Sequence, residues 1–174
     1  MLKKRNILIL FKCLVFIFLS MATWPLTAQE VRQPTGPVVL TITGKIQTHN
    51  LDRSYLWDLG MLEALPQKSF TTMTPWAKTP IKFSGPLLRD VLRTVQADGQ
   101  TLQAKALNDY VINIPVQDAQ LFDVVVAIKK NDQNIPLRQR GPLFVVYPFD
   151  SKKELQTIKY YERSIWQLKS LTVQ

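Results

Sequence analysis

The chain has 174 residues, of which 46% are hydrophobic and 20% charged, and its formal net charge is +9 at pH 7. It contains a single histidine, His49, and a single cysteine, Cys13. Zinc sites, and nucleophilic catalysis by a serine or cysteine paired with a histidine, need such residues in close groups, so the composition argues against both.

The first 28 residues predict a secretory signal peptide. Three positive charges near the start precede the apolar runs Ile7–Phe11 and Cys13–Ala22, which are separated by Lys12, and a small-residue step ends at Ala28. This order is typical of signal peptides, so we expect cleavage after Ala28 and export to the periplasm by the general secretory route. An uncleaved inner-membrane anchor is the alternative, although the interrupted apolar stretch is shorter than the ~20 residues that span a bilayer.

Cleavage would leave 146 residues with no cysteine and a net charge of +5. That length is typical of one domain. Pro34, Gly36 and Pro37 indicate that residues 29–37 are a loose leader, so we assign the domain to residues 38–174. Its basic residues are interleaved with acids rather than arranged in a stripe, so we expect no nucleic-acid partner.

The domain is expected to begin with a strand, a short helix and a second strand. Val38–Ile46 alternates apolar and polar positions, as a half-buried strand does. Asp52 or Ser54 can cap a helix that runs to Leu65. Residues 69–74 are rich in β-branched side chains and predict the second strand.

A helix and a hairpin are expected next. Gly85-Pro86, followed by a stripe of leucines and valines, predicts a helix that ends at Asp98-Gly99. Residues 101–106 and 110–114 then read as two strands joined by a turn at Asn108-Asp109.

The last part of the chain predicts three strands and one helix. Residues 122–128 and 143–147 are continuous apolar runs, which indicates strands buried on both faces, and residues 131–134 between them form a polar turn. A short helix is expected over 154–161 and a final strand over 165–173. Because strands and helices neither alternate nor segregate along the chain, we predict a single α+β domain with a mixed sheet.

Polar and aromatic side chains stand between the predicted buried strands. Thr71–Trp76 places a tryptophan beside a proline in a loop, which is typical of a cleft wall or of the edge of a core. Arg138 and Arg140 precede a buried strand and suit an anionic group or a structural carboxylate such as Asp150. Near the C-terminus, Arg163 and Trp166 again place an arginine close to an aromatic residue. Together these residues predict a modest cleft for a ligand or a partner.

Three further segments carry a family resemblance. Ile81–Leu92 is similar to a helix of the form G-x-x-L-x-x-L, Ala106–Pro115 to a D-G-Y corner, and Ile135–Pro148 to a strand that starts with G-x-P. In this order, over roughly residues 38–173, they resemble the sulfite-oxidase-type molybdopterin-binding domain, and most of all its small, stand-alone exported members. The resemblance implies an α+β fold with a barrel-like core of mixed sheet.

The departures from the family bear on function. In family enzymes a cysteine thiolate ligates molybdenum from a loop that corresponds here to residues 72–76, where this sequence offers Thr72, Thr74 and Pro75. A hydroxyl does not replace a soft thiolate without losing most of that ligation. The predicted signal peptide also lacks the arginine pair of the twin-arginine route, which carries folded, cofactor-loaded proteins.

These observations lead to the hypothesis of a cofactor-free domain that uses its cleft to bind a small anionic ligand or a membrane sensor protein. We assign no catalytic residue and no metal ligand. One alternative is a molybdopterin-dependent oxidoreductase with Thr72 or Thr74 as an unusual oxygen ligand, and another is an accessory or structural subunit. The candidate cleft residues are Thr72, Thr74, Trp76, Asn108, Tyr110, Arg138, Arg140 and Trp166.

Overall fold

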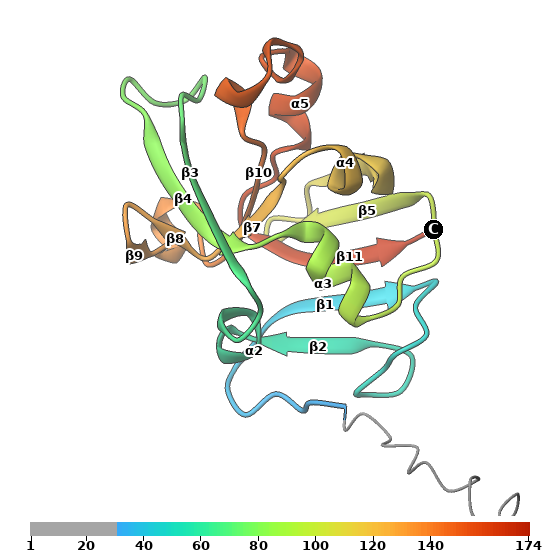
Figure 1. The fold of residues 1–174 in the computed structure, drawn as a ribbon. Helices are drawn as coiled ribbons and strands as arrows, with labels where there is room; N and C mark the ends of the chain where they lie inside the picture. Colours follow the sequence, from blue (N-terminus) through green and yellow to red (C-terminus); the bar gives the residue numbers. More distant parts are fainter. Residues whose placement is uncertain (1–30) are drawn as a thin grey trace, which may run out of the picture. The chain divides into compact units, whose positions relative to one another are not determined.

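A five-stranded mixed sheet forms one side of the domain (Figure 1). The structure, a computed structural model, describes residues 31–174, so the predicted signal peptide lies outside the described residues. The strand order is β2-β1-β11-β5-β6, in which β1 and β11 are parallel and every other neighbouring pair is antiparallel. The strands are β1 Val38–Gly44, β2 Tyr55–Asp58, β5 Thr101–Ala106, β6 Val111–Pro115 and β11 Leu168–Val173.

Two smaller sheets complete the β-structure. A four-stranded sheet has the order β3-β4-β8-β9, and β10 pairs with β7 in a two-stranded sheet. Isolated bridges between Leu87 and Val125, and between Phe144 and Trp166, connect the sheets around one core. The strands are β3 Gln67–Thr72, β4 Ile81–Pro86, β7 Val125–Ala127, β8 Lys129–Lys130, β9 Gln133–Asn134 and β10 Phe144–Val146.

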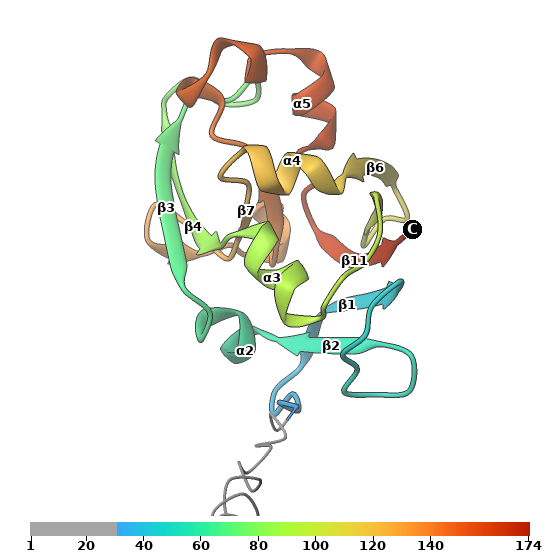
Figure 2. The ribbon, with the colours of Figure 1, turned by 45° about the vertical axis from the view of Figure 1, so that its right-hand side comes forward.

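The helices, four of which are labelled in Figure 2, are short and connect strands in chain order. In both ribbon views α3 lies beside β1, and the Val95 carbonyl after α3 accepts hydrogen bonds from the N–H groups of Gln47 and Thr48. No helix within residues 31–174 has the length and apolar character needed to cross a membrane. The α-helices are α2 Leu59–Glu63, α3 Leu88–Thr94, α4 Val116–Leu121 and α5 Ile158–Arg163, and the 3-10 helices are η1 Leu137–Gln139, η2 Phe149–Ser151 and η3 Lys153–Leu155.

This architecture confirms the predicted α+β fold with mixed sheet. The two apolar runs form β7 and β10, which are entirely buried as expected, and residues 101–106 and 111–115 form the predicted hairpin. The polar turn is also present, because Asn131 and Asp132 both adopt positive φ between β8 and β9, as a two-residue hairpin loop requires.

Two expectations about element type were wrong. Residues 55–58 form β2 rather than the first turns of a helix, because pairing with β1 satisfies their backbone, and the helix is limited to α2. Gly85-Pro86 ends β4 rather than starting a helix, and α3 begins at Leu88. A Cβ atom at Gly85 would stand 2.0 Å from the Val126 carbonyl oxygen, so this glycine allows the close contact of β4 with β7.

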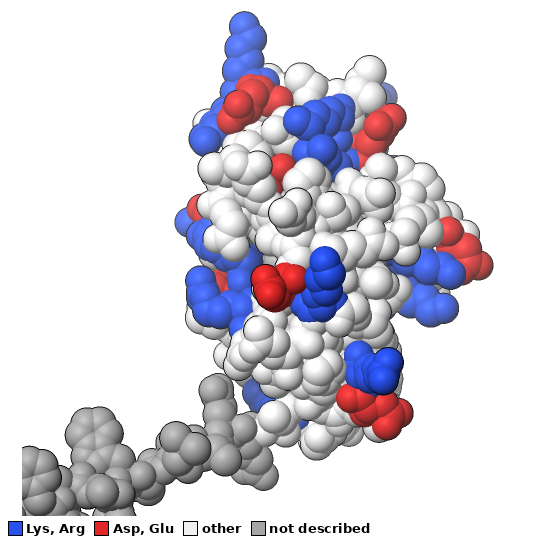
Figure 3. Space-filling view, turned by 90° about the vertical axis from the view of Figure 1, so that its right-hand side faces the viewer, with Lys and Arg blue, Asp and Glu red and all other residues white. Residues whose placement is uncertain are grey.

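Charged side chains of both signs are mixed over the face drawn in Figure 3, where Lys and Arg stand near Asp and Glu. Several of the described charges form exposed ion pairs, such as Lys105 with Asp109 at 2.8 Å and Arg93 with Asp90 at 2.7 Å. Exposed pairs of this kind contribute little to stability, so the fold depends mainly on its core.

Asp58, a buried carboxylate at the end of β2, joins the start of the described chain to α2. One oxygen accepts the N–H of Met61 at 2.7 Å and so caps the helix, while the other accepts the N–H groups of Thr35 at 2.6 Å and Gly36 at 2.8 Å. These hydrogen bonds, that of Met61 first, lower the pKa of the Asp58 carboxyl below its ordinary value, against the opposing effect of burial.

We expect Asp58→Ala to lower the free energy of unfolding by about 2 kcal/mol, because it removes the helix cap and leaves backbone donors unpaired. A carboxyl whose pKa is lowered by folding stabilises the protein above its unfolded pKa, and this contribution is lost as the pH falls through the folded pKa. The stability difference between wild type and variant in urea denaturation should therefore be largest near neutral pH and shrink below about pH 4. Glu63→Ala, on the exposed side of α2, is the control, and an equal loss there would contradict the assignment.

Candidate functional site

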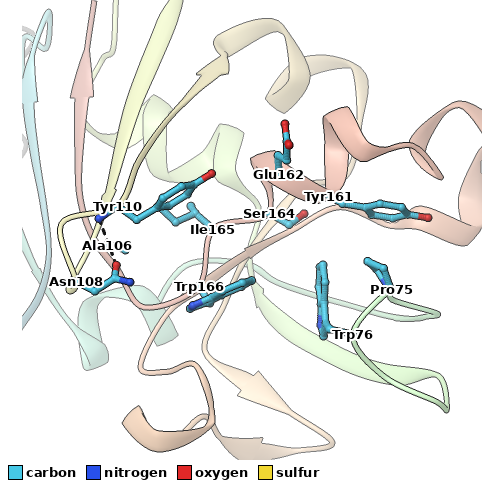
Figure 4. A pocket seen from close by; sticks show the side chains of 10 residues that line it. All are labelled: Pro75, Trp76, Ala106, Asn108, Tyr110, Tyr161, Glu162, Ser164, Ile165 and Trp166. Carbon is cyan, nitrogen blue, oxygen red and sulfur yellow. Dashed lines mark hydrogen bonds between the residues drawn. The ribbon is translucent and has the colours of Figure 1, made fainter.

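Two adjoining pockets share the side chain of Trp76 as a common wall. The first, which we call the aromatic pocket, has a volume of about 410 Å³ and is drawn in Figure 4. The second, which we call the basic pocket, has a volume of about 310 Å³. Trp76 stands in the loop between β3 and β4, so this loop contributes to both pockets.

The aromatic pocket is built from three segments that are distant in sequence. Its walls come from the β3–β4 loop, the turn between β5 and β6, and the segment from α5 to the start of β11. Asn108 orders the turn by accepting the N–H of Tyr110 at 3.3 Å, which is the dashed line in Figure 4. The lining residues are Pro75, Trp76, Ala106, Asn108, Tyr110, Tyr161, Glu162, Ser164, Ile165 and Trp166.

The aromatic rings of this pocket meet at steep angles. The Trp76 ring lies 6.3 Å from that of Trp166 at 69° and 6.5 Å from that of Tyr161 at 81°, measured between ring centroids and planes. Trp166 is 39% exposed and Tyr110 is 47% exposed, so both are accessible to a ligand. The rings of Trp76, Trp166 and Tyr161 therefore form adjoining apolar walls that meet at steep angles.

The guanidinium group of Arg140 stacks on the two tryptophans. Its central carbon lies 4.6 Å from the centroid of Trp166 and 5.5 Å from that of Trp76. One guanidinium nitrogen, Nη1, is buried and has no hydrogen-bond partner within residues 31–174. The electron-rich faces of the two indoles attract the positive charge of the Arg140 guanidinium.

The backbone holds Arg140 firmly. Its φ of +78° lies in the left-handed region that non-glycine residues seldom adopt, so the surroundings must enforce it. The Arg140 carbonyl accepts the N–H of Gln167 at 3.0 Å. At the next residue, Gly141, a Cβ atom would stand 1.8 Å from the Ile135 carbonyl oxygen, so only glycine fits there.

The basic pocket contains three cationic side chains, Lys130, Arg138 and Arg140, and no acidic residue lines it. Within residues 31–174, no carboxylate lies within 4.0 Å of the charged nitrogens of these three residues. The rest of the wall of the basic pocket is largely apolar. The other lining residues are Trp76, Ala77, Ile81, Phe83, Ile135, Gln139 and Phe144.

The eight candidate residues predicted from the sequence fall into three groups. Trp76, Asn108, Tyr110 and Trp166 line the aromatic pocket, and Arg138 and Arg140 join Trp76 in the basic pocket. The other two candidates, Thr72 and Thr74, are 1% and 5% exposed and line neither pocket.

The two threonines differ in how their hydroxyl groups are used. Thr72 Oγ1 accepts the N–H of Asp150 at 3.0 Å and donates to the Met73 carbonyl at 3.3 Å, while Asp150 accepts the N–H of Met73 at 2.6 Å. Thr72 therefore anchors the β3–β4 loop to η2. Thr74 Oγ1 is buried and has no partner among the described residues.

A buried polar network positions α5, which supplies part of the aromatic pocket. Asp118 in α4 accepts hydrogen bonds from Tyr147 Oη at 2.7 Å and from Arg163 Nη1 at 2.8 Å. Burial, and secondly the bond to Asp118, raise the pKa of the Tyr147 phenol, so the phenol remains a donor. Arg163 ends α5 directly after Tyr161 and Glu162, and the network thus fixes that edge of the pocket.

The sequence matches the model of a known family. A family model described as "Oxidoreductase molybdopterin binding domain" matches residues 48–164. The chain belongs to this family. A comparison with curated proteins found no match.

The residues present do not fit a molybdenum centre held by a thiolate, which the resemblance implies for family enzymes. The chain's single cysteine is Cys13, and no sulfur atom lines either pocket. Thr72, in the loop that corresponds to the ligating one, already uses its hydroxyl in the bonds described above. The donors in the pockets are nitrogen and oxygen atoms, which suit polar organic or inorganic ligands better than a soft metal site.

Sequence reasoning did not identify several lining residues. In the sequence, Lys130 is one of the basic residues interleaved with acids, and its place beside Arg138 depends on the β8–β9 hairpin. Tyr161 and Glu162 lie on α5, where the adjacent tyrosines 160 and 161 were the only local signal. Tertiary packing alone brings Lys130 to the basic pocket and Tyr161 and Glu162 to the aromatic pocket.

We expect Arg163→Met to lower the free energy of unfolding by about 3 kcal/mol, because it leaves the buried Asp118 carboxylate without its cationic partner. Lys159→Met, an exposed substitution on the same helix, should change stability by less than about 0.5 kcal/mol. Thermal or urea denaturation of both variants measures the difference. Equal stabilities would show that the network does not hold α5.

Proposed function

We propose that this chain is a ligand-binding member of the family that works without molybdenum and holds a small anion in the basic pocket. The observation that carries the proposal is the presence of Lys130, Arg138 and Arg140 around one pocket without a carboxylate partner in the described chain. Like charges gathered in this way repel one another, and an anion bound between them removes the repulsion.

The chemistry of the pocket favours a carboxylate, a sulfate or a phosphate. Guanidinium groups donate paired hydrogen bonds that match the oxygens of these anions, and a lysine adds a point charge. Arg140 is well suited to this role because its backbone and its stacking on the tryptophans fix it before a ligand arrives. A group held in place in advance loses little conformational entropy on binding.

The cofactor-free state and the periplasmic location are part of the proposal. The pattern of residues 1–28 supports export by the general secretory route, which threads an unfolded chain and cannot carry a cofactor inside a folded one. The engaged hydroxyl of Thr72 and the absence of a thiolate from both pockets support a protein that binds no molybdenum.

We expect inorganic phosphate or sulfate to bind saturably to the mature protein, as measured by calorimetry and by quenching of tryptophan fluorescence. Arg138→Gln and Lys130→Gln should each weaken binding on the order of tenfold, because each removes a charge-assisted hydrogen bond. Added sodium chloride should weaken it further through screening.

The matched control is Lys153→Gln, which removes an exposed positive charge outside both pockets. It should leave the affinity within about twofold of wild type. If all three variants lose the same affinity, binding reflects net charge only, and the basic pocket is not the site.

We also expect protein recovered from the periplasm to begin at Gln29 and to contain far less than stoichiometric molybdenum, because no thiolate is available to hold it. Mass spectrometry of the N-terminus and metal analysis of the same sample measure both properties. Stoichiometric molybdenum with a bound pterin would contradict the cofactor-free proposal and favour the oxidoreductase alternative.

A further inference from the structure

We propose a second binding site: the aromatic pocket binds the head group of a small organic cation of the quaternary ammonium class. Four aromatic residues, Trp76, Tyr110, Tyr161 and Trp166, line this pocket. Trp76 meets Trp166 and Tyr161 at steep angles, so a group in the corner contacts the faces of some rings and the edges of others. Such aromatic boxes attract cations through the negative faces of the rings.

The one charged residue that lines the pocket favours a cation over an anion. Glu162 is the only charged residue that lines it, and no lysine or arginine of the described chain does so. Glu162 is exposed and forms no ion pair within residues 31–174, and in Figure 4 its carboxylate points away from the two tryptophans. Its carboxylate is therefore available to attract an approaching cation.

The apolar lining selects a cation that is weakly hydrated. Apart from the amide of Asn108, the carboxylate of Glu162 and the hydroxyl groups, the walls are carbon surface from residues such as Pro75 and Ile165. A quaternary ammonium carries methyl groups and no N–H donors, so it leaves no hydrogen bond unmade when it enters such a pocket. A metal cation or a primary ammonium would lose most of its hydration and find only the few acceptor oxygens named above.

Arg140 limits the affinity. Its guanidinium occupies one side of Trp76 and Trp166 and does not line the aromatic pocket, so a ligand cation would be repelled across the rings. Tyr110, Tyr161 and Glu162, which do not contact Arg140 in this way, must supply the additional attraction. We therefore expect dissociation constants in the millimolar range, on the order of 4 kcal/mol of binding free energy.

The experiment titrates the mature wild-type protein with tetramethylammonium and choline chlorides by calorimetry, against sodium chloride at equal ionic strength. Choline should bind at least about fivefold more tightly than its uncharged carbon isostere, in which the nitrogen is replaced by carbon. Trp166→Leu should weaken choline binding at least about fivefold, and Glu162→Gln about two- to threefold. Glu154→Gln, an exposed acid on η3 outside the pocket, should have no effect.

The phosphate titration proposed above distinguishes this site from the anion site. Glu162→Gln should leave phosphate affinity unchanged, and Lys130→Gln should leave choline affinity unchanged, since each residue lines only one pocket. Equal binding of choline and its uncharged isostere would overturn the proposal, because the pocket would then be merely apolar. Absence of saturable binding by both cations would overturn it as well, whatever the phosphate result.

Discussion

The stacking of Arg140 on Trp76 and Trp166 is the interaction on which the site depends. It joins the loop between β3 and β4, the turn that follows η1, and the segment between α5 and β11, which are far apart in the sequence. A lysine would not serve equally well, because a planar guanidinium can lie over an indole and still keep donors other than the buried Nη1 free for a ligand. The same three residues divide the apolar cavity from the cationic one.

The chemistry of the two pockets differs from the thiolate-ligated metal centre that the resemblance implies for family enzymes. A domain without a ligating thiolate can still offer shape, charge and aromatic surface, because these depend on the scaffold and on different side chains. In this chain Thr72, in the loop that the resemblance relates to the metal-ligating one, hydrogen-bonds with Asp150 and Met73. Its hydroxyl therefore anchors the loop. The pocket walls are supplied by neighbouring residues of that loop, Pro75 and Trp76.

Much of the fold could be predicted because the strongest signals are local. The alternation of β1 and the apolar runs of β7 and β10 follow directly from burial on one or both faces. β2 and β4 could not be predicted in this way, because β2 is determined by pairing with β1 and the end of β4 by the contact of Gly85 with β7. Both errors arise where a partner strand overrides the local pattern of caps and prolines.

The pocket-lining residues could be predicted where large aromatic and cationic side chains are concentrated in short segments. Trp76, Arg138, Arg140 and Trp166 stand out because large aromatic and cationic side chains occur beside prolines and buried strands. Lys130 and Glu162 carry no comparable local signal, since an exposed charge on a hairpin or helix usually serves only solubility. Their places beside the pockets come from the sheet register and from the Asp118 network that orients α5.

Trp76 is a wall of both pockets, and this has a thermodynamic consequence. Any small displacement of the indole that improves the fit of an occupant on one side alters the space available on the other. Reciprocity then requires that each occupant change the affinity of the other by the same factor, whether the effect is cooperative or competitive. At the two proposed sites, this single shared side chain would thus couple the binding of two solutes of opposite charge.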